Sequence, residues 1–71
     1  MSVHKNIMFW RQKRGVSRKE LGKAVGVSGA QIRNHEQGIT PVKTDRLVLI
    51  SEHLKIAVAT LLRSNDDEEG E

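Results

Sequence analysis

The sequence predicts an all-α fold of about five short helices, two of which form a helix-turn-helix, followed by a disordered acidic tail. Signals that begin and end a helix occur twice in one register, and apolar residues recur at helical spacing. No segment alternates as a strand would. The expected helices cover roughly residues 2–14, 17–25, 28–37, 44–54 and 57–63. We therefore expect one domain over residues 1–63 and a tail, without apolar residues to bury, over residues 64–71.

The first expected helix, residues 2–14, has Val3, Ile7 and Trp10 at helical spacing. Because Trp10 belongs to this stripe, we expect it to pack in the core. The alternative role, stacking on a nucleic-acid base, has little support. Phe9 is the only other aromatic residue, and single-stranded binding depends on several stacking side chains.

The second expected helix, residues 17–25, has start and stop signals at both ends. Ser17 and Glu20 match a capping box, and Val16 before the cap can pack onto Leu21 as a hydrophobic staple. Gly26 stands where a residue in the left-handed conformation would end the helix. The signals therefore delimit a short helix that ends in a sharp glycine turn.

The same signals recur eleven residues later and delimit the third expected helix, residues 28–37. Ser28 and Gln31 form the second capping box, Val27 and Ile32 the second staple, and Gly38 the second stop. Two helices of this length joined by a glycine turn are typical of a helix-turn-helix.

Apolar spacing also defines the last two expected helices. Pro41, the only proline, lies in the loop of residues 38–43 and separates them from the helix-turn-helix. Their expected core residues are Leu47, Ile50 and Leu54 in the fourth helix and Val58, Leu61 and Leu62 in the fifth. The run LVLI, residues 47–50, has more apolar width than one core face needs. It predicts a homodimer through these helices, unless Val48 and Leu49 are merely scattered exposed residues.

Length and composition exclude several classes of protein. A chain of 71 residues has room for one modest core and not for a deep catalytic pocket. It contains no cysteine, and its three histidines, His4, His35 and His53, are scattered, so we expect no disulfide, no metal site and no cofactor. Because no phosphate-binding glycine loop or nucleophile motif occurs, we do not expect an enzyme. No apolar run approaches the ~20 residues of a membrane span, and no signal peptide opens the chain, so we expect a cytoplasmic protein.

Charge is distributed unevenly along the chain, whose formal net charge is +3. Residues 1–63 hold twelve basic and four acidic residues, a net charge of +8, whereas five acidic residues lie in the last eight positions. The basic residues of interest in the first three helices are Arg11, Lys13, Arg14, Arg18, Lys19, Lys23 and Arg33. A basic face is typical of proteins that bind a polyanion, but it can also be a solvated surface. Together with the two-helix motif, it favours nucleic acid as the partner.

Six residues of the motif match the pattern of a known family: Leu21, Val25, Gly26, Val27, Ile32 and Glu36. At these positions the chain resembles the phage-repressor-like DNA-binding domains of the lambda repressor and XRE family. Ile7 and residues 11–15 resemble the first helix of the family, and residues 54–62 resemble its last helical turn and fifth helix. The resemblance covers nearly all of the expected domain and implies a compact five-helix fold that binds double-stranded DNA.

The third helix would present its outward face to a groove of DNA. With Ile32 inward, a helix places His35 and Glu36 near the core. The residues expected to point outward are Ala30, Asn34 and Gln37, flanked by Gln31 and Arg33. Arginine can bind guanine, asparagine or glutamine can bind adenine, and alanine can contact a thymine methyl. Polar residues facing water are the simpler alternative, but the position after the glycine turn favours DNA contact.

The resemblance implies specific contact residues. We expect bases to be contacted by Gly29, Ala30, Gln31, Arg33 and Asn34, and phosphates by Ser17, Arg18, Lys19, Gln37 and Lys43. The family usually has glutamine where this chain has Arg18, so that phosphate contact should become a charged one. Gly29 and Ala30 lack hydrogen-bonding side chains, so recognition must depend on the other three base-contacting residues or on DNA shape.

The resemblance also implies features that support the fold. Arg11 and Glu36 match positions that form an inward-facing ion pair between the first and third helices. Gly22 and His35 depart from the family pattern, which usually has alanine and a large apolar or aromatic residue there. A glycine inside a helix costs roughly 0.5–1 kcal/mol relative to alanine, and a close helix crossing would explain it.

These observations lead to one main functional expectation and two alternatives. We expect sequence-specific binding of double-stranded DNA by a small prokaryotic or phage transcriptional regulator, which acts at the nucleoid as a homodimer. The first alternative is an antitoxin-type regulator that also binds a toxin. The second is a protein-interaction module that retains the fold without binding DNA, which the glycine and alanine at positions 29 and 30 would favour.

Overall fold

Five helices and their loops make up residues 3–63, the part of the chain that the computed structural model describes. The helices are α1 (Val3–Lys13), α2 (Arg18–Val25), α3 (Gly29–Glu36), α4 (Thr44–Leu54) and α5 (Val58–Leu62). No strand occurs within residues 3–63. The all-α prediction is confirmed, and each helix lies within one residue of its expected bounds. The expected acidic tail, residues 64–71, lies outside the described residues.

The helices of the motif begin and end as the sequence predicts. Ser17 Oγ accepts a hydrogen bond from the backbone N–H of Glu20 at 3.0 Å, and Ser28 Oγ accepts one from the N–H of Gln31 at 3.1 Å. Each serine lies just outside its helix as the N-cap, because its backbone is extended. Gly26 ends α2 with φ of 86°, and Gly38 follows α3 with φ of 75°, a conformation that glycine adopts without strain.

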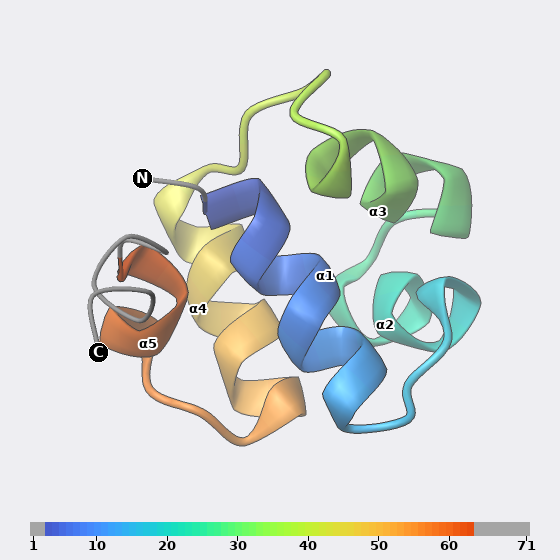
Figure 1. Ribbon diagram of the computed structural model, residues 1–71. Coiled ribbons are helices and arrows are strands. Elements are labelled where there is room, and N and C mark those ends of the chain that lie inside the picture. Colours follow the sequence, from blue (N-terminus) through green and yellow to red (C-terminus); the bar gives the residue numbers. More distant parts are fainter. Residues whose placement is uncertain (1–2, 64–71) are drawn as a thin grey trace.

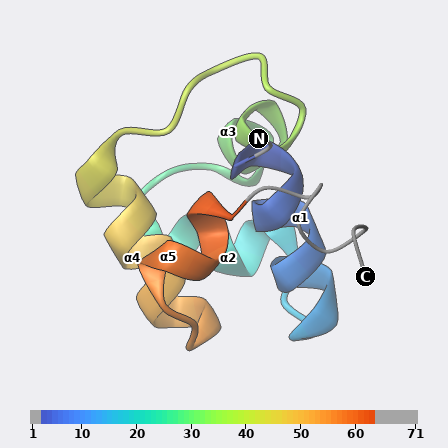
Figure 2. The same ribbon diagram turned by 60° about the vertical axis from the view of Figure 1, so that its left-hand side comes forward.

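The helices pack around one shared centre. In Figure 1, α1 crosses the front of the molecule, with α2 and α3 to its right and α4 and α5 to its left. The turned view in Figure 2 shows α4 and α1 flanking α5, with the α3–α4 loop arching over them. α1 contacts α3, α4 and α5, while α2 packs against α3 and α4. The helix-turn-helix therefore rests on a scaffold made of the other three helices.

The core is apolar and draws on every helix. Its buried residues are Ile7, Leu21, Val25, Ile32, Leu47, Ile50, Leu54 and Leu61, and Val3 and Trp10 pack partly buried against them. The expectation that Leu62 is a core residue is wrong, since its side chain is 42% exposed. Neighbouring residues differ in direction by about 100° around a helix, so the short α5 directs Leu61 inward and Leu62 outward.

The glycine at position 22 is explained by a close backbone contact. A Cβ atom at Gly22 would lie 2.5 Å from the carbonyl oxygen of Val27 and 2.9 Å from that of Ser28. The N–H of Val27 also donates to the carbonyl of Gly22 at 2.8 Å. α2 therefore lies directly against the turn that leads into α3, and this contact fixes the angle between the two helices.

Candidate nucleic-acid interface

The outward face of α3 has the composition expected from the sequence. Ile32, His35 and Glu36 are buried, while Ala30, Arg33 and Gln37 are exposed. Gln31 and Asn34 are partly buried. Asn34 is less exposed than helix geometry alone predicts. The loop after α3 folds back toward it, since the backbone carbonyl of Asn34 accepts hydrogen bonds from the N–H of Ile39 at 2.9 Å and of Thr40 at 3.3 Å.

Gly29, the first residue of α3, lies against the start of α2. A Cβ at Gly29 would lie 3.2 Å from the backbone nitrogen of Lys19 and 3.3 Å from its Cα. A side chain here would thus point toward α2, and the contribution of Gly29 to any ligand is its backbone. The contact also places the expected phosphate-binding residues Ser17, Arg18 and Lys19 beside the first turn of α3. The start of α2 therefore lies next to the first expected base-contacting residue of α3.

A buried carboxylate joins three helices beneath this surface. Glu36 on α3 pairs with Arg11 on α1 through Nε, with a second bond from Arg11 Nη2 at 3.3 Å. This is the ion pair that the family resemblance implied. Arg11 also donates from Nη1 to the carbonyl oxygen of Val16 at 2.9 Å, which ties the ion pair to the loop before α2.

The carboxylate has a second partner that sequence reasoning missed. Arg18 Nε, at the start of α2, donates to Glu36 Oε1 at 3.0 Å. The Glu36 side chain is fully buried, whereas those of Arg11 and Arg18 are 10% and 37% exposed. No local pattern links Arg18 to Glu36, because their contact depends on the angle between α2 and α3. A buried carboxylate that lost its partners would destabilise the fold by ~3–5 kcal/mol.

The fold divides the basic residues into two groups. Arg11 is buried, and Arg14 caps the end of α4 by donating from Nε to the carbonyl of Leu54 at 2.8 Å. Arg14 also stacks over the Trp10 ring, with its Cζ 5.4 Å from the ring centroid. Arg14 nevertheless remains exposed, as are Lys13, Lys19, Lys23 and Arg33, while Arg18 is partly buried. The expected phosphate contacts Ser17, Gln37 and Lys43 are exposed as well. Arg11, Arg14 and Arg18 thus all make bonds within the fold, so the basic face is less free than the sequence suggests.

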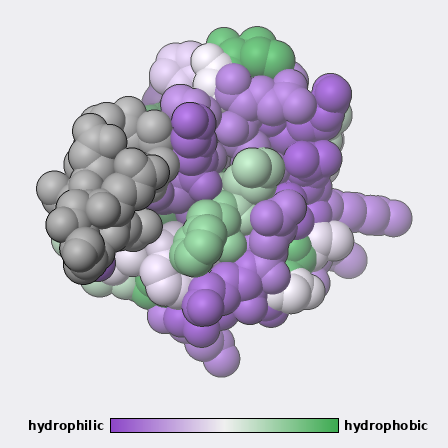
Figure 3. All heavy atoms as spheres, in the orientation of Figure 1, coloured by the Kyte–Doolittle hydropathy of each residue, from purple (hydrophilic) through white to green (hydrophobic). Residues whose placement is uncertain are grey.

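Hydrophilic residues cover most of the face shown in Figure 3, including the region over α2 and α3. Figure 3 shows one hydrophobic group at the top of the molecule and a second near its centre. On the α3–α4 loop, Ile39 is 65% exposed. Other large hydrophobic side chains with substantial exposure are Phe9, Leu49 and Leu62.

His35 anchors the loop that follows α3. Its fully buried ring bonds through Nδ1 to the carbonyl oxygen of Thr40 at 2.9 Å, and Nε2 lies 3.5 Å from Arg46 Nη1. Because a carbonyl only accepts and arginine only donates, the neutral ring with the proton on Nδ1 satisfies both contacts. Where the family usually has a large apolar or aromatic residue, the buried His35 therefore forms a polar link between α3 and the loop.

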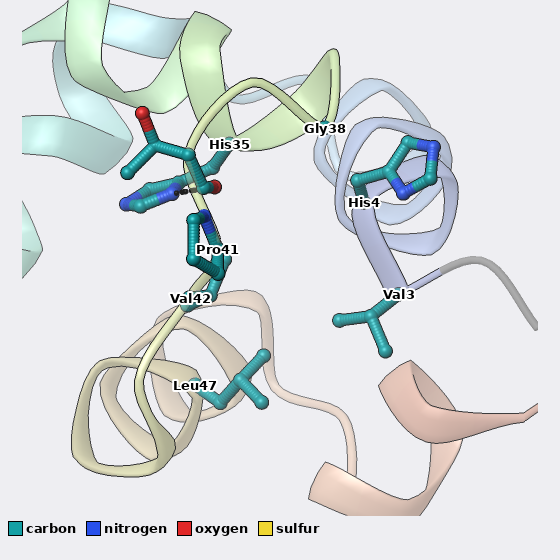
Figure 4. Close-up of a pocket in the computed structure, with 8 residues that line it drawn as sticks. Val3, His4, His35, Gly38, Pro41, Val42 and Leu47 are labelled. Carbon is teal, nitrogen blue, oxygen red and sulfur yellow. Dashed lines mark hydrogen bonds between the residues drawn. The ribbon is translucent and has the colours of Figure 1, made fainter.

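A small cavity of about 370 Å³ lies beside His35, between the start of α1, the α3–α4 loop and α4. Figure 4 shows Val3 and His4 of α1 across from Pro41 and Val42 of the loop, with the His35–Thr40 hydrogen bond on the loop side. The lining of the cavity is mainly apolar.

Among residues 3–63, no group of three His, Asp or Glu side chains could hold a metal ion. No helix in this part of the chain is long and apolar enough to cross a membrane.

Comparison with known proteins agrees with this geometry. A family model described as helix-turn-helix matches residues 7–61. The clp gene regulator ClgR from Corynebacterium glutamicum gives a TM-score of 0.83 at 26% identity, covering 86% of this chain and 65% of that one. A second ClgR crystal structure gives a TM-score of 0.81 at 26% identity, covering 86% and 79%. No curated protein sequence matches the chain.

A phage protein is also among the similar structures. The P22 c2 repressor protein, crystallised in complex with synthetic operator 9T in the presence of Tl+, gives a TM-score of 0.78 at 28% identity, covering 86% of this chain and 92% of that one. The family match extends from α1 to α5 and includes the capped α2 and α3, the glycine turn and Glu36. The chain therefore belongs to the helix-turn-helix family HTH_3, the XRE-type DNA-binding domains of phage-repressor-like regulators.

Proposed function

We propose that this protein is a small prokaryotic or phage transcriptional regulator that binds double-stranded DNA with sequence specificity and inserts α3 into the major groove. The observation that supports this most is the placement of the first turn of α3 beside the start of α2, where Gly29 meets the backbone of Lys19. Eight residues make α3 about 12 Å long, which suits a major groove about 12 Å wide. The operator complex of the P22 c2 repressor, a structural relative, also supports it.

We assign base recognition to the first half and outward face of α3. Arg33 is exposed and has the donor pair that binds the O6 and N7 atoms of guanine, while Asn34 and Gln31 have amides that can bind adenine. Ala30 is exposed and can contact a thymine methyl, whereas Gly29 offers its backbone. With two of these five positions lacking polar side chains, the sequence-dependent shape of DNA should contribute to specificity.

We assign phosphate binding to residues on both sides of α3. Ser17, Arg18 and Lys19 lie at the start of α2, and Gln37 and Lys43 follow the end of α3. Contacts of this kind fix the register of a protein on DNA without carrying sequence information. Two groups on opposite sides of the recognition helix would hold it in place along the groove.

We further propose that the protein acts in the cytoplasm, at the nucleoid, as a homodimer through α4 and α5. Leu49 on α4 and Leu62 on α5 are 45% and 42% exposed, and two copies would cover them. Sedimentation with and without DNA should then give two copies on a site whose halves lie about one helical turn apart. One copy per half-site at every concentration would contradict the dimer. The family match and the structural relatives do not favour the antitoxin alternative or the protein-interaction alternative.

An NMR titration of the full chain with duplex DNA tests the placement of α3. We expect the largest amide shifts in residues 17–19 and 29–34, because these backbones would lie closest to the duplex. α5 lies on the side of α1 opposite the helix-turn-helix in Figure 1, and its amides serve as the internal control. The largest shifts in α5, with little change in α3, would contradict the proposed orientation.

A further inference from the structure

The contact between Arg18 and Glu36 stabilises the fold and also orients the Arg18 guanidinium. Arg18 stands at the start of α2, where a charged phosphate contact is expected, and bonds to the buried Glu36 through Nε at 3.0 Å. We infer that Glu36 is a positioning residue that holds the Arg18 guanidinium so that its two Nη groups bind one DNA phosphate. The inference rests on the proposed function and deepens it.

The shape of the guanidinium makes this division possible. It is a planar fork with five N–H donors, and the bond to Glu36 uses the Nε donor. The terminal edge formed by Nη1 and Nη2 can then bind two oxygens of a phosphate side by side. The Glu36 side chain is fully buried, whereas that of Arg18 is 37% exposed, so the guanidinium extends from the buried carboxylate toward the surface.

The charge of the cluster also suits an anion. One carboxylate lies between two guanidinium groups, so Arg11, Glu36 and Arg18 together have a net charge of +1. Arg11 is 10% exposed and bonds to Glu36 and Val16, so the excess positive charge is accessible at Arg18. Because Glu36 already restricts the Arg18 side chain, less conformational entropy is lost when a phosphate binds.

Arg18→Lys is the first test, since it keeps the charge and removes the fork. A lysine ammonium can face the carboxylate or the phosphate, but it cannot hold both with separate planar edges. We expect about tenfold weaker binding to preferred and random duplexes alike, with the salt dependence unchanged because the charge is unchanged. Arg63→Lys, the same change at the end of α5, is the matched control and should bind like the wild type.

Glu36→Gln is the second test, because positioning and simple electrostatics predict opposite changes in the affinity for DNA. The variant adds one positive charge, so electrostatic attraction alone predicts tighter binding to random DNA. Loss of the anchor for Arg18 predicts the opposite, a decrease of about three- to tenfold. Affinities are compared at a temperature where circular dichroism shows the variant to be folded. If Glu36→Gln does not fold, the Arg18→Lys and Arg63→Lys pair decides the question.

The outcomes separate this inference from the proposed function. Fluorescence anisotropy with a labelled random duplex, measured over a series of salt concentrations, is the assay. Binding by the wild type with a tenfold loss in Arg18→Lys and none in Arg63→Lys supports positioning. If Arg18→Lys binds as tightly as Arg63→Lys and the wild type, the positioning role is overturned and DNA binding stands. A wild-type protein that binds no duplex at any salt concentration overturns both.

Discussion

Replacing Gly22 by alanine tests the packing that sets the angle between α2 and α3. The new methyl carbon would lie 2.5 Å from the carbonyl oxygen of Val27 and 2.9 Å from both the carbonyl carbon and oxygen of Ser28. All three are backbone atoms, so no side-chain rotation relieves the contact. The turn would have to move away from α2, and α3 would move with it.

Two opposing effects determine the change in stability. Alanine is a better helix former than glycine by roughly 0.5–1 kcal/mol, which favours the variant. Overpacking of a rigid site costs about 1–3 kcal/mol, and three backbone contacts under 3 Å place this site at the upper end. We therefore expect a net destabilisation of about 2 kcal/mol. For a domain of this size, that corresponds to a decrease in Tm of roughly 8–16 °C.

Thermal unfolding followed by circular dichroism measures this change. Gly29→Ala is the graded control, because its closest contact would be 3.2 Å and a shift of a few tenths of an ångström would relieve it. Lys23→Ala, at an exposed position of the same helix, controls for adding an alanine to α2. A higher Tm for Gly22→Ala than for the wild type would mean that helix propensity outweighs packing, and the close approach of α2 to the turn would be refuted.

Four further changes probe the interface and its support. Arg33→Ala and Asn34→Ala should each cost ~1–3 kcal/mol on the preferred site and relax the preference at one base position, and an unchanged ratio of specific to random affinity in both would exclude α3 as the recognition element. Arg11→Ala should lower the free energy of unfolding in urea by about 3 kcal/mol, because Glu36 stays buried with one partner, and a change below ~1 kcal/mol would count against the ion pair. Deleting residues 64–71 removes five acidic residues and should tighten binding to random DNA at low salt, whereas an unchanged affinity would show that the tail does not compete with DNA.

Features determined by neighbouring residues could be predicted from the sequence. The Ser17 and Ser28 caps and the Gly26 stop depend on contacts within a few residues, so their signals are complete in the local sequence. The burial of His35 and Glu36 also follows from the helical period once Ile32 is placed in the core.

Features that depend on how the helices cross could not be predicted in this way. The bond between Arg18 and Glu36 requires the angle between α2 and α3, and the use of Arg14 to cap α4 requires the position of α1 against α4. The same applies to Asn6, whose side chain donates to the carbonyl oxygens of Leu61 and Arg63 at 2.8 and 2.7 Å. No local pattern around Asn6 indicates the carbonyls at the end of α5 that it binds.

Selection of bound sequences from a pool of random DNA duplexes tests the central claim most directly. The wild-type protein should enrich a defined motif with two half-sites about one helical turn apart, because a dimer would present two copies of α3 to successive major grooves. The double variant Arg33→Ala with Asn34→Ala should enrich a weaker or altered motif from the same pool. A wild-type selection that ends with no enriched motif after repeated rounds would contradict sequence-specific DNA binding by this protein.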